Sequence, residues 1–345
     1  MDGTIFLFLL QDGATSGALY ALLALALVLV FAVTRIIFIP QGEFVAFGAL
    51  TYAVLATGAL PGTVWLLAGF GAAAFAVEMW SERRTLTARF VARHALVKLA
   101  LPAAVFAVAA VVAPEKPGPI AAALLTVAIV APIGPYLYRV AFHPMAEASI
   151  LVLLIAAVGV HFALTGLALL FFGAEGLRAP PLWSASVAAG PLTVTGQSLS
   201  VYAFTALLMG GLYVFFARTL WGKALLATAV NRLGARLVGV PTTLAGEISV
   251  ALAALMGAVS GILMAPITTV YYDTGFLIGL KGFVAATIAG LLSFPGAAVA
   301  ALAVGIVEAF ASFFASAFTE IIVFMLLVPV LLVRSIFSHA AEEDE

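Results

Sequence analysis

The sequence predicts an all-α protein whose helices cross a lipid bilayer many times. Hydrophobic residues make up 65% of the 345 residues and charged residues only 9%, whereas soluble domains are usually about 45–50% apolar. The apolar runs are long and rich in Ala and Leu, and they do not alternate with polar residues. They therefore match membrane-spanning helices of about 20 residues rather than the roughly ten-residue strands of a membrane barrel.

Eleven apolar segments can be read along the chain, and several are short enough to be broken or re-entrant. We therefore expect about nine to eleven transmembrane or re-entrant helices, forming one transmembrane domain over residues 1–345. The segments cover residues 13–34, 42–58, 61–79, 99–113, 119–138, 149–172, 199–217, 244–267, 277–293, 297–316 and 318–333. Turn-forming stretches such as "APEKPGP" at 113–119 and "SFPG" at 293–296 separate them.

The composition also excludes several classes of protein. Cysteine is absent, which rules out disulfides and cysteine-ligated metals. A net charge of −1 rules out a nucleic-acid binder that works by bulk charge. The first ten residues carry no Lys or Arg, unlike the basic start of a signal peptide, so the first apolar stretch is expected to remain in the mature protein.

The positions of the basic residues predict the orientation, because cytoplasmic loops are enriched in Lys and Arg. With the N-terminus outside and eleven crossings, twelve basic residues lie inside and only Lys116 and Arg178 lie outside. The inside group is Arg35, Arg83, Arg84, Arg89, Arg93, Lys98, Arg139, Arg218, Lys223, Arg232, Arg236 and Arg334. The loop 173–198 is then periplasmic, whereas the loop 218–242 and the acidic tail 338–345 are cytoplasmic.

The loop 218–242 combines cations with a helical apolar pattern. Its cations are Arg218, Lys223, Arg232 and Arg236, with no acid among them. Its apolar stripe is Leu226, Val230, Leu233 and Leu237. This spacing predicts one helix over 222–239. Gly222, Gly234 and Gly239 would allow close approach or tight turns at its ends and middle. The helix could lie in the lipid interface, with its cations among phosphates, or could dock on a cytosolic partner.

Ionisable residues inside apolar segments are costly and mark pathways or structural pairs. Lys281 and Glu308 lie in neighbouring segments. We favour a buried ion pair between them over a role for Lys281 in binding the substrate carboxylate. Glu43 follows "PQG" and could stabilise its own helix start or line a cavity. Glu320 lies near the outer end of the last segment, at its start, and is expected to reach water.

Sequence patterns typical of enzymes are missing. His94, His143, His161 and His339 are scattered, without metal-ligand spacing, and His161 is expected to be a hydrogen-bonded core residue. There is neither a G-x-S-x-G elbow nor a phosphate-binding loop. We therefore expect neither a catalytic centre nor a metal or cofactor bound by this chain. One class that remains open is an ion-coupled secondary transporter, which would use acids such as Glu308.

The chain resembles the permease subunits of the branched-chain amino acid class of ABC importers, the LivH-type proteins. The resemblance covers nearly the whole chain. Four blocks carry it: "DGATSGALYALLALALVLVFAVTRIIFIPQGEFVAFGA" at 12–49, "LLIAAVGVHFALTGLALLFFG" at 153–173, "TLWGKALLATAVNRLGARLVGV" at 219–240 and "GLKGFVAATIAGLLSFPGAAVAALAVGIVEAF" at 279–310.

The resemblance implies that the basic helix is a coupling helix that inserts into a groove on an ATPase subunit. The residues concerned are Gly222, Leu226, Val230, Asn231, Arg232, Leu233, Arg236, Leu237 and Gly239. Arg232 and Arg236 would pair with acids at the rim of that groove. The implied partners are two ATPase subunits that bind ATP and Mg, a second permease (LivM-type or a second copy), a periplasmic binding protein and lipid. The implied location is the bacterial inner membrane.

The chain departs from the family pattern at several places, which bears on the solute carried. Gln41 replaces the usual His in "IFIPQGE" at 37–43, although Gly42 and Glu43 remain. Leu291 replaces a usual glycine, and "YRVAFHPMAEAS" at 138–149 replaces the usual Arg-Pro-Leu-Arg segment. Residues near 80–138 form a longer segment than the family usually has. Related permeases carry urea, amides and aromatic acids as well as branched-chain amino acids.

Overall fold

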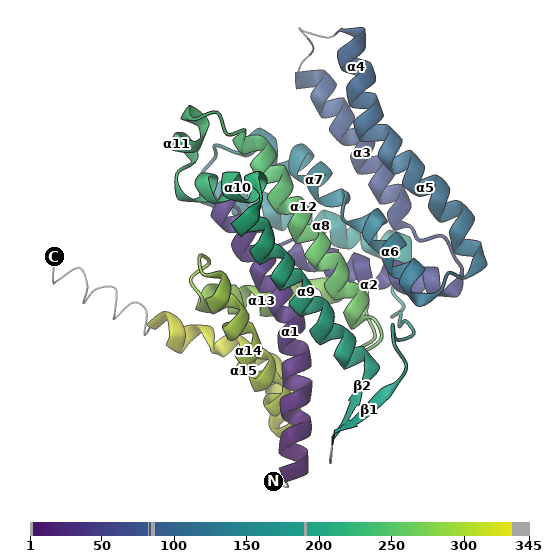
Figure 1. The fold of residues 1–345 in the computed structure, drawn as a ribbon, viewed down its shortest axis with the longest axis vertical. Helices are drawn as coiled ribbons and strands as arrows, with labels where there is room; N and C mark the ends of the chain where they lie inside the picture. Colours follow the sequence, from purple (N-terminus) through teal and green to yellow (C-terminus); the bar gives the residue numbers. More distant parts are fainter. Residues whose placement is uncertain (1–2, 82, 84–86, 190–191, 333–345) are drawn as a thin grey trace, which may run out of the picture.

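The computed structural model describes residues 3–81, 83, 87–189 and 192–332, which form a bundle of helices with a β-hairpin at one end (Figure 1). Eight helical segments in this part of the chain are long and apolar enough to cross a membrane. The expected all-α polytopic fold is therefore confirmed. Arg84, Arg334, His339 and the tail 338–345 lie outside the described residues.

The elements follow the chain in a simple order, with short π or 3₁₀ turns (η) between some helices. They are α1 (Gly3–Thr34), α2 (Gln41–Thr57), α3 (Thr63–Ser81), α4 (Ala88–Ala95), η1 (Leu96–Ala100), α5 (Leu101–Val112), η2 (Ala113–Glu115), α6 (Pro119–Val130), α7 (Ile133–Leu137), η3 (Tyr138–Phe142), η4 (His143–Met145), α8 (Ile150–Phe172), β1 (Ser186–Ala189), β2 (Leu192–Thr195), α9 (Gly196–Arg218), α10 (Leu220–Val230), α11 (Arg232–Leu237), α12 (Thr242–Met264), α13 (Thr274–Ile288), α14 (Phe294–Ala315), η5 (Ser316–Phe318) and α15 (Thr319–Met325).

Two expectations about these elements are corrected. The first helix begins at Gly3, ten residues before the expected start. The loop 173–198 contains an antiparallel hairpin in which Ser186 pairs with Thr195. The break expected between the last two segments is present, because Ala315 leaves the helical conformation (φ −149°, ψ 58°) and the turn η5 separates α14 from α15.

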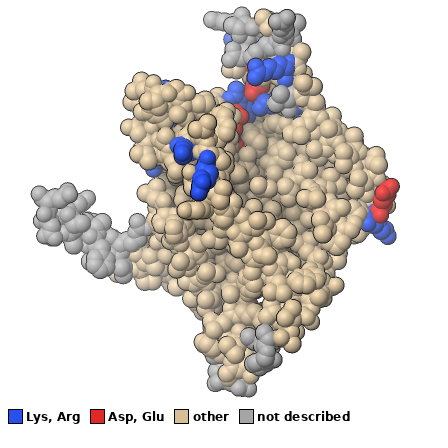
Figure 2. Space-filling view, viewed as in Figure 1, with Lys and Arg blue, Asp and Glu red and all other residues tan. Residues whose placement is uncertain are grey.

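The molecule has two distinct ends (Figure 1). Helices α4, α10 and α11 lie at one end, and the hairpin and the N-terminus lie at the other. Between the ends, the face drawn in Figure 2 carries almost no Lys, Arg, Asp or Glu. Such a belt suits a protein that lipid surrounds, because charged side chains are costly at membrane depth.

Helix α1 forms the centre of the bundle and packs against α14, α12, α13 and α9. Its contact with α14 is made by backbone, because a Cβ on Gly17 would lie 2.7 Å from the Cα of Leu302. Gly13 likewise meets Ile306, where a Cβ would lie 2.6 Å from the Cα. Small residues allow this close approach, which provides the dispersion energy that holds helices together in lipid.

Two helices, α2 with 17 residues and α13 with 15, are shorter than the roughly 20 residues of a usual membrane-spanning helix, and their N-terminal ends meet inside the bundle. A Cβ on Gly42 would overlap the carbonyl of Gly275, and Gly279 lies one turn further along α13. The side chain of Gln41 donates to the carbonyl of Ala253 (2.9 Å), halfway along α12. Both helices therefore begin within the bundle, as the broken helices of many transporters do.

The single helix expected over 222–239 is wrong, because the chain breaks at Asn231. This residue is extended (φ −149°, ψ 101°), and its Oδ1 accepts a hydrogen bond from the backbone N–H of Gly234 (2.8 Å). Asn is a favoured N-cap, because its side chain satisfies a free N–H of the first helical turn. Asn231 therefore starts a second helix, α11. Gly239, at φ 87°, follows the end of α11.

Candidate functional site

An exposed apolar surface lies on α10 and α11, despite the break between them. It consists of Leu226, Val230, Leu233 and Leu237, which are 42%, 85%, 68% and 80% exposed. We call these four residues the coupling surface. Helix α10 is held against α9, because a Cβ on Gly222 would overlap the carbonyl of Phe215. The surface is thus a fixed apolar patch at one end of the molecule, of the kind that marks an interaction site.

Lys281 lies between two carboxylates inside the bundle. Its Nζ is 2.5 Å from Glu308 Oε1 and 2.9 Å from Glu320 Oε1. The structure therefore brings Lys281 and Glu308 together, as the favoured interpretation expects. Glu320 of α15 is 45% exposed, as expected for a residue that reaches water, but its carboxylate also pairs with Lys281, which was not expected. This charged triad ties α13, α14 and α15 together and holds one net negative charge.

Glu43 is completely buried and pairs with His161 of α8. The distance from Glu43 Oε1 to His161 Nδ1 is 2.8 Å, and Phe276 of α13 stacks on the imidazole at 4.6 Å between centroids. His161 is thus the hydrogen-bonded core residue that was expected. Its partner was not predicted, because the two residues are 118 positions apart in the sequence. The pair joins α8 to the place where α2 and α13 meet.

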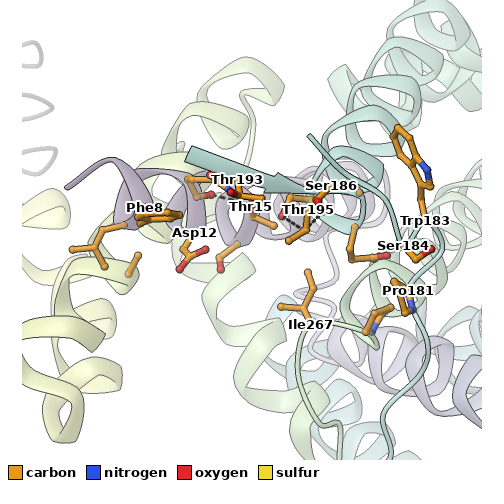
Figure 3. A pocket seen from close by; sticks show the side chains of 18 of the residues that line it. Phe8, Asp12, Thr15, Pro181, Trp183, Ser184, Ser186, Thr193, Thr195 and Ile267 are labelled. Atoms are coloured by element: carbon orange, nitrogen blue, oxygen red, sulfur yellow. Dashed lines mark hydrogen bonds between the residues drawn. The ribbon is translucent and has the colours of Figure 1, made fainter. Parts of the chain in front are cut away.

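A large open cavity lies at the hairpin end, opposite the coupling surface (Figure 3). Its volume is about 1170 Å³. The start of α1, the hairpin with its flanking loop, the connection after α12 and part of α14 form its walls. Many of the lining side chains are polar, among them Asp12, Thr15, Ser184, Ser186, Thr193 and Thr195. We call this cavity the vestibule.

The family model for the permease component of branched-chain amino acid transport systems matches residues 9–333. The chain belongs to this family. It is similar to the high-affinity branched-chain amino acid transport permease LivH of Escherichia coli K12, with 27% identity over 341 residues that cover 95% of this chain and 94% of the relative. It is also similar to LivH of Salmonella typhimurium LT2, at 26% identity over the same shares.

BraD of Pseudomonas aeruginosa is 28% identical over 222 residues, which cover 62% of this permease and 72% of the relative. No solved structure matches the permease. The family resemblance carried by its sequence blocks is thus confirmed. The resemblance assigns a role in ATPase binding to residues of the loop 218–242. The structure places this loop at the end of the permease opposite the vestibule.

The two arginines of α11 bind other parts of the permease. Arg232 Nη1 donates to the carbonyl of Ala146 (2.9 Å). Arg236 Nη1 donates to Glu147 Oε1 (2.8 Å), and its Nε donates to Thr242 Oγ1 (2.9 Å). The Arg236 hydrogen bond and charge lower the pKa of the Glu147 carboxyl. Within the chain both cations therefore fasten α11 to the turn before α8, and their pairing with acids of a partner stays a prediction.

Replacing Arg236 by alanine is expected to loosen α11 without unfolding the permease. Backbone amides of residues 232–238 should exchange hydrogen about two- to fivefold faster, a modest change because the ion pair with Glu147 is exposed. The paired Glu147 has a lowered pKa, so this fastening is present above the ordinary carboxyl pKa and is lost as the pH falls through the lowered value. Lys223→Ala on α10 is the matched control. Equal exchange in both variants would show that Arg236 does not hold α11.

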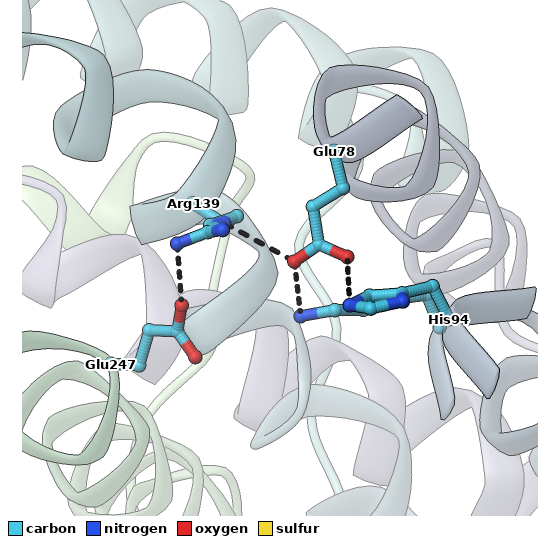
Figure 4. A network of polar contacts seen from close by, with 5 residues as sticks. Glu78, His94, Arg139 and Glu247 are labelled. Atoms are coloured by element: carbon cyan, nitrogen blue, oxygen red, sulfur yellow. Dashed lines mark hydrogen bonds and ion pairs between the residues drawn. The ribbon is translucent and has the colours of Figure 1, made fainter. Parts of the chain in front are cut away.

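Helix α3 and the segment α4–η1 that follows it are joined to the bundle by a cluster of charges (Figure 4). Glu78 Oε1 lies 3.4 Å from Lys98 Nζ and 3.2 Å from Arg139 Nε. Glu78 Oε2 lies 3.7 Å from His94 Nε2, and Arg139 Nη1 lies 3.4 Å from Glu247 Oε1 on α12. The cluster therefore links α3, α4 and η1 to α12, the helix that follows α11. No sequence motif singled out Glu78.

Proposed function

We propose that the chain forms the membrane pathway of an ATP-driven importer for branched-chain or other hydrophobic amino acids. The family membership and the names of the relatives support the solute class. The Ala- and Leu-rich bundle supplies the membrane body. The vestibule and the coupling surface lie at opposite ends, as an importer needs when solute arrives on one side and force is applied from the other.

The observation that carries this proposal is the exposure of the coupling surface. Six large apolar side chains are exposed on α10 and α11, the four of the coupling surface together with Leu220 and Trp221, and the positions of both helices are fixed by caps and by Arg232. Buried apolar anchors dominate most protein contacts, so such a patch suits a groove on a cytosolic ATPase subunit. In this proposal two ATPase subunits bind ATP and Mg, a second permease or a second copy completes the pathway, and a periplasmic protein delivers the solute.

Co-purification tests this function. When the permease is expressed with the ATPase, permease and binding-protein genes of its own system, we expect it to leave the membrane in mild detergent with ATPase subunits attached. In proteoliposomes of that complex, leucine should accumulate only when ATP is present on the side of the membrane that carries the ATPase subunits. Accumulation by the permease alone, driven by a proton or sodium gradient, would contradict the proposal and identify a secondary transporter.

The proposed orientation places the hairpin end in the periplasm and α10 and α11 in the cytoplasm. Because the chain has no cysteine, single cysteines can report it. Cysteines at the exposed positions Ala174 and Ala188 should react with an impermeant maleimide in intact spheroplasts, and one at the exposed Lys223 only after permeabilisation. The cysteine-free parent is the control for background. If Lys223→Cys were the only one of the three variants labelled in intact spheroplasts, the orientation would be opposite to the proposed one.

A further inference from the structure

The vestibule contains charges of both signs on different walls. Asp12, on α1, is exposed and forms no ion pair with any described residue. Glu308, on α14, lines the cavity from the charged triad. Arg178 lies on the loop that leads to the hairpin. The space therefore offers carboxylates on the helix side and a guanidinium on the hairpin side.

The acidic wall is built where α1 and α14 meet. Gly13 of α1 packs against α14, since a Cβ on Gly13 would lie 2.6 Å from Ile306 Cα and 3.1 Å from the carbonyl oxygen of Gly305. Asp12, next to Gly13, and Glu308, two residues after Ile306, both line the cavity. Asp12 is exposed, so its carboxylate can accept hydrogen bonds from an ammonium group, which has three donors.

The basic wall has a guanidinium that is already held in place. Nε and Nη2 of Arg178 donate to the carbonyl of Pro266 (3.1 and 3.0 Å), and Nη2 also donates to that of Ile267 (3.2 Å). Its Nη1 donates to none of the described residues. Because two carbonyls fix the group, the remaining N–H donors are ready for a carboxylate, which Arg binds with charge-assisted hydrogen bonds.

We propose that the vestibule is a transit site for a free α-amino acid in its zwitterionic form. Asp12 receives the ammonium group, and Arg178 receives the carboxylate. The proposal rests on the proposed function, and it adds the site and the two charged groups by which the solute is recognised. The cavity exceeds the usual range of about 300–1,000 Å³ for small-molecule sites, so the solute enters hydrated and is held by charge rather than by shape.

Cysteine reactivity in the assembled importer tests the charge of the vestibule. Ser184 lines the cavity, whereas Ala174, exposed on the same loop, does not. In proteoliposomes, Ser184→Cys, on the loop that carries Arg178, should react with sulfonatoethyl methanethiosulfonate severalfold faster, relative to the trimethylammonium-ethyl reagent, than Ala174→Cys does, because charged clefts concentrate ions of opposite sign. Adding Arg178→Gln should lower this preference by about threefold.

Protection by defined solutes tests the ligand. Millimolar L-leucine should slow the modification of Ser184→Cys severalfold and leave that of Ala174→Cys unchanged. 3-Methylbutylamine, which lacks the carboxylate, and 4-methylpentanoate, which lacks the ammonium group, should protect much less. With Arg178→Gln added, leucine and 3-methylbutylamine should protect Ser184→Cys from modification equally.

Two results would overturn the inference. Equal reagent preference at Ser184 and Ala174, or equal protection by leucine and the amine, would show that the vestibule does not recognise a zwitterion. Protection by the binding protein alone, with none from leucine, would instead assign the cavity to docking of that protein. ATP-driven uptake of leucine by the unmodified importer is measured in the same vesicles. Its presence shows that the proposed function holds even if the vestibule inference fails.

Discussion

Replacing Lys281 by methionine is expected to prevent stable assembly of the permease in the membrane. The change removes the only cation that contacts Glu308 and Glu320 among the described residues. Removing one partner of a buried ion pair typically costs about 3–5 kcal/mol, because the remaining charge stays in an apolar environment. Here two carboxylates remain. We expect loss of the monodisperse peak in detergent size-exclusion chromatography and a strongly reduced yield of membrane-inserted protein.

Combined substitutions separate a structural triad from a substrate site. Adding Glu308→Gln to Lys281→Met should recover only part of the yield, since Glu320 keeps its charge. The triple variant that also carries Glu320→Gln should recover most of it, because no unpaired charge remains. Glu320→Gln alone is the matched control and should assemble well, since this side chain is 45% exposed and Lys281 retains Glu308. Normal yield of Lys281→Met with loss of uptake would instead favour contact with the substrate carboxylate.

The sequence predicts the long helices of this fold well, because the length of an apolar run is enough to identify a membrane-spanning helix. A run of about 20 apolar residues has no other stable form in lipid. The half-length helices α2 and α13 are harder to predict. Each reads as an ordinary apolar segment, and only the backbone contact of Gly42 with Gly275 reveals that both begin inside the bundle. The proline and glycine of "PQG" at 40–42 mark the break between α1 and α2, but they do not show how far inside the bundle α2 begins.

The pairing of charges depends on tertiary structure, and the sequence predicts it only in part. Lys281 and Glu308 lie on consecutive helices, so their contact can be expected. Glu43 and His161 are far apart in the chain, and nothing local relates them. The intramolecular contacts of Arg236 depend on the break at Asn231, which turns the second half of the loop towards Glu147. That break had a local signal, because Asn is a common N-cap.

Replacing Leu233 by aspartate is expected to abolish ATP-driven uptake while leaving the permease folded. Leu233 is 68% exposed, so its replacement disturbs little packing within the chain. Seated in a groove of an ATPase subunit, the same side chain would be a buried anchor, whose loss typically costs about 2 kcal/mol or more. A carboxylate in that groove adds the cost of an unpaired buried charge. Recovery of ATPase subunits with the purified permease should fall at least tenfold.

The matched control places the same charge beside the coupling surface. Ala227 is exposed on α10 and is not one of the four coupling-surface residues, so Ala227→Asp should retain both uptake and ATPase subunits. Leu237→Asp should behave as Leu233→Asp does, because Leu237 stands one turn further along the same helix and is 80% exposed. Full uptake by Leu233→Asp, with ATPase subunits still attached, would mean that α10 and α11 only rest in the lipid interface. The force from ATP hydrolysis would then have to enter the permease elsewhere.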